Sequence, residues 1–206
     1  MSSCKLTYFD FEALAEAIRF LLHYGKIQFE DIRVNFEKDW PTYPKDNLPL
    51  RQLPILEIDG KIFYQTIAIC RYLAKKVGLA GSTPLEDYEI DNAVDNLNDF
   101  RARLAGAYYE QNAVAKEEKL KIAINETVPF FLDKLEAIAQ QNDGHFALKR
   151  FTWADVYFTG MRRYLAKLVG SEDLTVNYPN LRKVAENTES APGIKEWVTR
   201  RPDTFY

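Results

Sequence analysis

Three short features of this sequence combine residue types that can bind and activate a ligand. Tyr8 places a hydroxyl just before a helix-like segment, although taken alone it reads equally well as an ordinary strand tyrosine. Leu53-Pro54 opens a strand-like run and marks either a strand edge or a tight, cis turn. Gln65-Thr66 begins a helix, where free backbone N–H groups attract anions, unless Thr66 only caps that helix. Together these features suit an extended peptide that carries carboxylates.

The histidines and cysteines of the sequence do not indicate nucleophilic catalysis or metal binding. The two histidines, His23 and His145, lie far apart and have no serine or cysteine context that would make a triad. The two cysteines, Cys4 and Cys70, lie outside any paired-cysteine motif, so we expect buried, free thiols. The sequence therefore predicts no metal site and no histidine-activated nucleophile.

Charge and hydropathy restrict the partners. The formal net charge of the 206 residues is −3, which argues against nucleic acid because phosphate binding needs an excess of Lys and Arg. The N-terminus shows no signal-peptide pattern, and no stretch approaches the roughly 18 apolar residues that span a bilayer. We therefore expect a cytoplasmic protein that binds neither nucleic acid nor membrane.

The first part of the chain alternates strand-like and helix-like segments. Apolar residues at Leu14, Ile18 and Leu21 have helical spacing, and Asp59-Gly60 is a strong hairpin signal. We predict strands over residues 5–9, 27–34, 54–58 and 61–64, helices over 12–24 and 66–77, and a proline-rich loop over 39–53. This order, β-α-β, loop, β-β-α, contains no dinucleotide or phosphate-loop fingerprint.

Strand signals vanish beyond the linker-like segment 78–84 (GLAGSTP). We predict helices over 85–109, 116–140, 153–169, 179–188 and 193–198. Thr152 and Asp155 have the spacing of a capping box at the start of one of them. The fold class is thus α/β plus all-α, with an N-terminal domain over residues 1–80 and an all-helical domain over 85–206.

Asp91, Asp95 and Asp99 recur at every fourth position of the predicted helix 85–109, so they share one face. Such a stripe is either a solvated acidic face or a surface that meets a cationic ligand group or a partner chain. Arg101 and Arg103 lie close enough to offset part of this charge.

Longer motifs resemble a known family. The run KLTYF, the DW-P loop, LPILEIDG and YQTIAICRYLAKKVGLAG are similar to the N-terminal domain of sigma-class glutathione transferases. This class includes insect enzymes and haematopoietic prostaglandin D synthase. DNAVDNLNDFRA, FTWADVYF and WVTRRPDT extend the resemblance over essentially the whole chain. It implies a thioredoxin-like N-terminal domain, a homodimer, and glutathione as co-substrate.

The resemblance also implies roles for individual residues. Tyr8 matches the catalytic tyrosine whose hydroxyl hydrogen-bonds the glutathione sulfur, and Asp99 matches an acid that reaches into the partner subunit's site. The implied glutathione site consists of Tyr8, Trp40, Lys45, Arg51, Gln52, Leu53, Pro54, Gln65, Thr66 and Asp99. For the electrophile we expect an apolar cleft between the domains, with walls from Phe9, Leu14, Leu104, Tyr108, Tyr157 and Met161.

The implied chemistry is thiol activation. A free thiol has a pKa of about 8.5, so little of it is thiolate at neutral pH. One charge-assisted hydrogen bond is worth roughly 1.5–3 kcal/mol, and each pKa unit corresponds to about 1.4 kcal/mol. A donor such as Tyr8 would thus lower the thiol pKa by about one to two units. The thiolate then attacks hydrophobic electrophiles such as lipid-derived aldehydes, or a peroxide.

The sequence departs from the sigma pattern at four places. Leu14 stands where many members have arginine, and Pro49-Leu50-Arg51 replaces Pro-Phe-Gly in the glutathione loop. Thr66 replaces serine, and Lys149 replaces a glycine before the capping box. The alternative to a transferase is a non-catalytic relative that binds hydrophobic ligands or is structural, like lens crystallins. Prostaglandin isomerisation is a narrower variant, disfavoured by Leu14.

Overall fold

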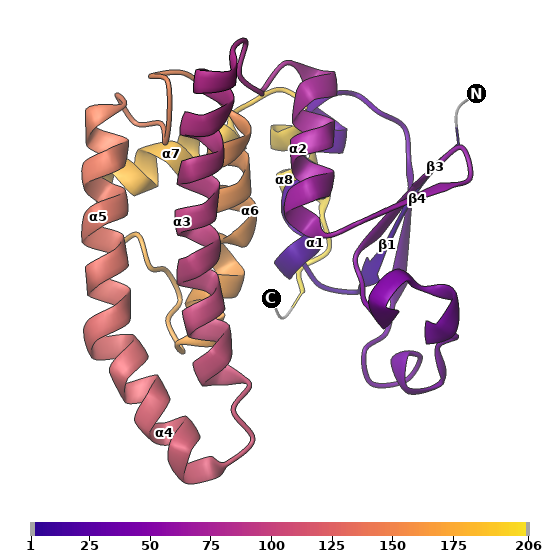
Figure 1. Cartoon of the computed structure of the whole chain (residues 1–206), viewed down its shortest axis with the longest axis horizontal. Helices are drawn as coiled ribbons and strands as arrows, with labels where there is room; N and C mark the ends of the chain where they lie inside the picture. Colours follow the sequence, from indigo (N-terminus) through magenta and orange to yellow (C-terminus); the bar gives the residue numbers. More distant parts are fainter. Residues whose placement is uncertain (1–2, 205–206) are drawn as a thin grey trace.

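The computed structural model describes residues 3–204 of the chain. Its N-terminal part is a sheet with two helices, and the remainder is helical (Figure 1). The predicted order, an α/β part followed by an all-helical part, is therefore confirmed. The sheet lies at one end of the molecule, and α4 (Ala113–Ile122) and α5 (Val128–Gln141) lie at the opposite end (Figure 1).

The sheet is mixed, with strand order β2-β1-β3-β4. Its strands are β1 (Cys4–Phe9), β2 (Glu30–Val34), β3 (Ile55–Ile58) and β4 (Lys61–Tyr64). β1 runs parallel to β2 and antiparallel to β3, and β3 pairs antiparallel with β4. At the turn, Asp59 and Gly60 have φ angles of 50° and 80°, as the predicted hairpin requires. This is the thioredoxin-like arrangement that the resemblance implied.

Eight α-helices are found in the described residues. They are α1 (Ala13–Tyr24), α2 (Thr66–Val77), α3 (Pro84–Tyr108), α4, α5, α6 (Trp153–Leu168), α7 (Pro179–Glu189) and α8 (Ile194–Arg200). The predicted capping box at the start of α6 is present, with the Thr152 N–H donating to Asp155 Oδ2 at 2.8 Å. Within residues 3–204, no helix combines the length and the apolar character needed to cross a membrane.

Three predicted segments need correction. The second strand begins at Glu30 instead of residue 27, because Ile27 N–H donates to the Leu22 carbonyl and so still belongs to the turn after α1. The predicted helix 116–140 begins at Ala113 and contains a π-helical turn, η4 (Ala123–Thr127), where the chain enters α5. The third strand begins after Pro54, which cannot donate to the ladder.

The proline-rich loop consists of three short 3-10 turns. These are η1 (Trp40–Thr42), η2 (Lys45–Asn47) and η3 (Pro49–Arg51). Leu50 and Arg51 both have left-handed φ angles, of 53° and 52°. This conformation costs a residue with a Cβ roughly 1–2 kcal/mol, and glycine much less. Arg51, which stands where the family pattern has glycine, therefore adopts a conformation that glycine would adopt at lower cost.

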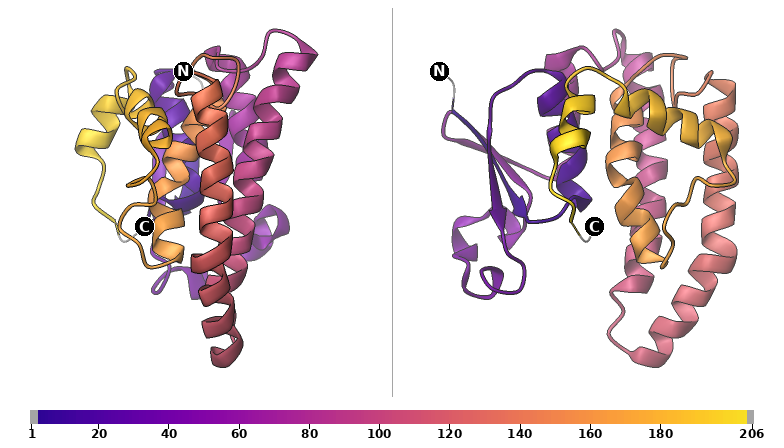
Figure 2. Two further views of the ribbon diagram at one scale, coloured as in Figure 1. Left: turned by 90° about the vertical axis from the view of Figure 1, so that its left-hand side faces the viewer. Right: turned by 180° about the vertical axis from the view of Figure 1, so that it is seen from behind.

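The sheet domain and the helical domain meet along α1 and α6. Helix α8 packs beside α1 and lies in front of it when the molecule of Figure 1 is seen from behind, as in the right-hand view of Figure 2. A Cβ added at Gly160 of α6 would lie 2.6 Å from Ala17 N of α1, so glycine permits this close approach. Buried Glu16 of α1 accepts from Trp197 Nε1 at 2.8 Å and pairs with Arg201 at 3.0 Å. These contacts fix the position of α1 between the two domains.

Candidate active site

Tyr8 lies near the end of β1 and is buried, with 3% of its surface exposed. Its hydroxyl accepts a hydrogen bond from the Leu14 N–H at 3.4 Å, so the hydroxyl proton remains available for donation. Burial raises the pKa of Tyr8 above its ordinary value of 10.0, although the bond from Leu14 and the positive charges of Arg19 and Arg101 oppose the shift. At neutral pH Tyr8 is therefore a neutral hydrogen-bond donor.

The loop between β1 and α1 is held by charges from distant parts of the chain. Ala13 has a left-handed φ of 31°, which turns the chain so that the Leu14 N–H faces Tyr8. Buried Glu12 pairs with Arg163 of α6 at 2.5 Å and with Arg201, just after α8, at 3.2 Å. Burial outweighs these arginines and raises the pKa of Glu12 to about 7. The helical domain thus helps to position the N–H that contacts Tyr8.

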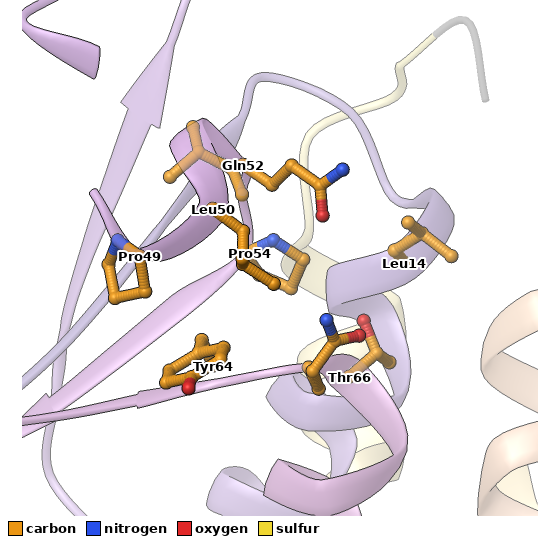
Figure 3. Close-up of a pocket in the computed structure, with 9 residues that line it drawn as sticks. Leu14, Pro49, Leu50, Gln52, Pro54, Tyr64 and Thr66 are labelled. Atoms are coloured by element: carbon orange, nitrogen blue, oxygen red, sulfur yellow. The ribbon is translucent and has the colours of Figure 1, made fainter. Parts of the chain in front are cut away.

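A pocket lies between the loop that precedes β3 and the start of α2 (Figure 3). It is lined by Leu14, Pro49, Leu50, Gln52, Leu53, Pro54, Tyr64, Gln65 and Thr66. The Leu53-Pro54 bond is cis, one of the two alternatives that the sequence allowed. Gln52 and Thr66 lie on opposite sides of Pro54 in Figure 3. Five residues of the implied glutathione site, Gln52, Leu53, Pro54, Gln65 and Thr66, are therefore brought together here.

The backbone at the start of α2 is unusual. Gln65 has φ 71° and ψ 109°, a conformation that residues with a Cβ rarely adopt and that often marks functional sites. Thr66 is the first residue of α2 and is mostly buried. Because the first N–H groups of a helix have no partner within it, this corner of the pocket favours an anionic group.

The other implied glutathione residues do not line this pocket. In the preceding loop, Lys45 Nζ lies 4.7 Å from the centroid of the Trp40 ring. Arg51 pairs with Asp46 at 2.6 Å, and its side chain is 72% exposed. Arg51 therefore does not block the space between Gln52 and Thr66. Asp99 is exposed on α3, outside both this pocket and the cavity beside Tyr8.

A second cavity, of about 370 Å³, lies beside Tyr8 between the two domains. It is lined by Tyr8, Phe9, Phe11, Ala13, Leu14, Phe36, Leu53, Arg101, Ala105, Tyr109 and Tyr164. Leu14 and Leu53 also line the first pocket, so the two spaces adjoin at these side chains. An extended ligand in the pocket and an apolar molecule in the cavity would meet close to Tyr8.

Of the six residues expected to line the cavity, only two do so. Phe9 and Leu14 line the cavity. Leu104, Tyr157 and Met161 are buried in the core and do not line it, and neither does Tyr108. On α3, Leu104 continues the buried stripe, so packing directs it away from the cavity.

Three cavity residues were not predicted from the sequence: Arg101 and Ala105 of α3 and Tyr109, the residue directly after it, which recur at every fourth position and so share the face that lines the cavity. That spacing was visible in the sequence, but it does not say which face of α3 meets the first domain. Tyr164, two turns of α6 beyond Tyr157, was missed for the same reason. Within residues 3–204, no three His, Cys, Asp or Glu side chains gather into a group that could hold a metal ion.

Comparison with known proteins assigns the chain to a family. Residues 4–75 match the family model "Glutathione S-transferase, N-terminal domain", and residues 98–201 match "Glutathione S-transferase, C-terminal domain". The chain is 46% identical over 202 residues to Glutathione S-transferase S1 of Drosophila melanogaster, covering 98% of this chain and 80% of that protein. It is 43% identical over 204 residues to Glutathione S-transferase of Anopheles gambiae, covering 99% of each.

A solved structure is similar over the whole fold. The prostaglandin synthase D of Nilaparvata lugens superposes with a TM-score of 0.92 at 37% identity, covering 98% of this chain and 100% of that one. The chain therefore belongs to the glutathione S-transferase family, whose enzymes use glutathione as co-substrate.

Proposed function

We propose that this protein is a sigma-class glutathione transferase that joins the glutathione sulfur to hydrophobic electrophiles such as lipid-derived aldehydes. One observation carries the proposal: Tyr8, whose hydroxyl is a hydrogen-bond donor, lines the cavity, and Leu14, whose N–H donates to that hydroxyl, lines both spaces. A thiol lying at this junction would receive a hydrogen bond from Tyr8 that favours the thiolate. The neighbouring apolar walls would hold the electrophile.

In this proposal glutathione lies extended across the cis Leu53-Pro54 turn. The backbone of Leu53 pairs with its cysteinyl part, and Gln65 and Thr66 bind the γ-glutamyl carboxylate at the start of α2. Trp40 and Lys45 hold the glycine end. Arg51, whose guanidinium faces Asp46, contributes at most to the shape of the loop.

The proposal includes a cytoplasmic homodimer in which Asp99 reaches the partner's γ-glutamyl amine. Support comes from the acidic stripe, since Asp91 pairs with Arg71 within the chain, whereas Asp99 is exposed and no ion pair of the described residues includes it. Sedimentation analysis tests the dimer. We expect Asp99→Asn to raise the glutathione KM, and a monomeric wild type would contradict this part of the proposal.

Replacing the hydroxyl of Tyr8 tests the catalytic role. Losing a charge-assisted hydrogen bond of roughly 1.5–3 kcal/mol predicts that Tyr8→Phe lowers kcat/KM by about 10- to 150-fold. The pKa of bound glutathione, followed by thiolate absorbance against pH, is expected to rise by about one to two units. A variant that keeps the wild-type thiol pKa would exclude Tyr8 as the activating group.

Two other functions remain as alternatives. The similarity to the Nilaparvata lugens protein favours prostaglandin isomerisation as the narrower one. A hydrophobic-ligand-binding or structural protein, like a lens crystallin, is the other. Assays with aldehydes, aryl halides, hydroperoxides and a prostaglandin endoperoxide separate them, because a structural protein turns over none of these and an isomerase only the last.

A further inference from the structure

Arg101 brings a positive charge into an otherwise uncharged cavity. The remaining residues that line the cavity are apolar or tyrosines, and none of those described is acidic. Arg101 lies on α3, on the same face as Ala105 and Tyr109. Its charge reaches the tyrosines around the cavity, because it opposes the upward pKa shifts of Tyr8 and Tyr164.

The hydrogen-bond partner of Arg101 is neutral. Its Nε donates to Asn98 Oδ1 at 3.0 Å, and its positive charge opposes the upward pKa shift of the buried Tyr157 hydroxyl. No ion pair in the described part of the chain includes Arg101. The cation is thus held in place by a neutral group and is not neutralised.

Two other arginines near the domain junction do have counter-charges. Arg19 pairs with Glu16 and Asp31, and Arg201 pairs with Glu12 and Glu16. A charge that is removed from water without a counter-charge is costly, so this chain compensates its guanidinium groups where the domains meet. Among residues 3–204, the ion pairs leave out Arg101, Arg103, Arg182 and Arg200, and of these four Arg101 lines the cavity beside Tyr8.

We propose that Arg101 binds a carboxylate on the electrophile, so that the preferred second substrate is an amphipathic acid with an apolar body. This rests on the proposed function and specifies its substrate class. A planar guanidinium binds a carboxylate through two parallel hydrogen bonds. The apolar body would lie against Phe9, Phe11 and Leu14, with its reactive carbon toward the sulfur at Tyr8.

The chemistry of the conjugation is unchanged by this anchor. With an α,β-unsaturated ketone, the thiolate forms a bond to the β-carbon while the carbon–carbon π bond breaks. The electron pair moves onto the enolate oxygen, and the α-carbon then takes a proton from solvent. The carboxylate stays intact, so Arg101 acts on binding and orientation alone.

A matched pair of substrates tests the proposal. The probes are an aryl enone with a carboxylate on the ring and its methyl ester, which differ in charge but share the reactive group. We expect the wild type to prefer the acid by about ten-fold or more in kcat/KM, as a charge-assisted hydrogen bond provides. Arg101→Gln is expected to abolish this acid-to-ester preference, mainly through the KM of the acid.

Two further variants make the result specific. Arg101→Lys keeps the positive charge, so we expect it to keep part of the preference for the acid over the ester. This result would show that Arg101→Gln loses the preference because it loses the charge, and not because it misfolds. Arg103→Gln changes an exposed arginine of the same helix that does not line the cavity, and it should keep the wild-type preference.

The outcomes separate this proposal from the function on which it rests. If the wild type converts acid and ester equally, or Arg101→Gln keeps the preference, the carboxylate site is wrong while conjugation stands. If Arg101→Gln raises the glutathione KM as strongly as that of the acid, Arg101 binds glutathione and the proposal is overturned. If neither enone reacts and the wild type also turns over none of the aldehydes, aryl halides and hydroperoxides, the proposed function fails. A binding assay then tests the carboxylate site directly. A fluorescent fatty acid is displaced from the cavity by a long-chain acid or by the matching alcohol, and equal displacement by the two overturns the carboxylate site.

Discussion

The pocket between Gln52 and Thr66 and the cavity beside Tyr8 share Leu14 and Leu53, yet they draw their walls from different parts of the chain. The pocket comes entirely from residues 14–66 and depends on backbone features, namely a cis bond and a left-handed Gln65. The cavity needs Arg101, Tyr109 and Tyr164 from the helical domain. In the proposed function, the glutathione pocket of one protomer is therefore built by the first domain, whereas the shape of the second-substrate cavity depends on how the two domains pack.

The largest effect is expected at the close contact between α1 and α6. In Gly160→Ala the new Cβ would lie 2.6 Å from Ala17 N, so α1 and α6 must separate. Overpacking typically costs about 1–3 kcal/mol, and we expect a fall in Tm of about 2–12 °C, measured by calorimetry. The electrophile KM should rise more than the glutathione KM, because Leu14 and Tyr164 lie on the two helices that separate.

Gly106→Ala is the matched control for this change. A Cβ at Gly106 of α3 would meet nothing within 4 Å, so the variant should gain roughly 0.5–1 kcal/mol from helix propensity. Equal Tm values for the two variants would contradict a tight contact between α1 and α6.

The next effect concerns the pocket alone. Thr66→Val removes a hydroxyl at the start of α2, and we expect the glutathione KM to rise by about ten-fold while kcat changes little. Thr66→Ser, which keeps the hydroxyl, should remain close to wild type. Steady-state kinetics with varied glutathione provide the measurement. A lower kcat at unchanged KM would place Thr66 in the chemical step instead.

Glu12, where both domains meet the Tyr8 loop, should make stability depend on pH. Burial raises its pKa from 4.5 to about 7, so between these values the folded protein holds a proton that the unfolded chain releases. Wild type therefore loses stability relative to Glu12→Gln as the pH rises from 4.5 to about 7. Thermal unfolding of both proteins across this range is the check. A constant difference in Tm would mean that Glu12 titrates normally.

The smallest effect is expected in the loop of the first pocket. Arg51 has a φ angle of 52° and pairs with Asp46 only at the surface. Arg51→Gly should relieve backbone strain and stabilise the protein by up to about 1 kcal/mol, measured by denaturant unfolding. Asp46→Ala removes the ion pair alone and should change stability by less. A several-fold rise in the glutathione KM of Arg51→Gly would place this guanidinium in the tripeptide site.

Much of the pocket was predictable because its parts are close in sequence. Pro54 lies just before β3, and Thr66 lies just after β4. Because the Asp59-Gly60 turn fixes the pairing of these two strands, a short stretch of sequence determines the relative positions of the two residues. The left-handed conformation of Leu50 and Arg51 was not predictable, since both residue types disfavour it. This backbone conformation therefore depends on how the loop packs in the folded protein.

The cavity was less predictable for a geometric reason. Successive residues of a helix point about 100° apart, so the choice between Leu104 and Ala105 depends on a rotation that the sequence alone leaves open. Similarly, the pairing of Glu12 with Arg163 and Arg201 joins residues far apart along the chain. Such contacts exist only once α6 and α8 have packed against α1.

The sequence by itself determined the fold class and the order of the elements, because these follow from local periodicity, turn chemistry and short-range strand pairing. The motifs around Tyr8, Pro54 and Thr66 suited an extended peptide with carboxylates, and their resemblance to a family implied that this peptide is glutathione. The tertiary structure alone decided that Arg101 and Tyr164 face the cavity and that Arg51 does not enter the pocket. The physical reason is that the orientation of a side chain is set by the packing of whole helices and loops, which sums many weak contacts between distant residues.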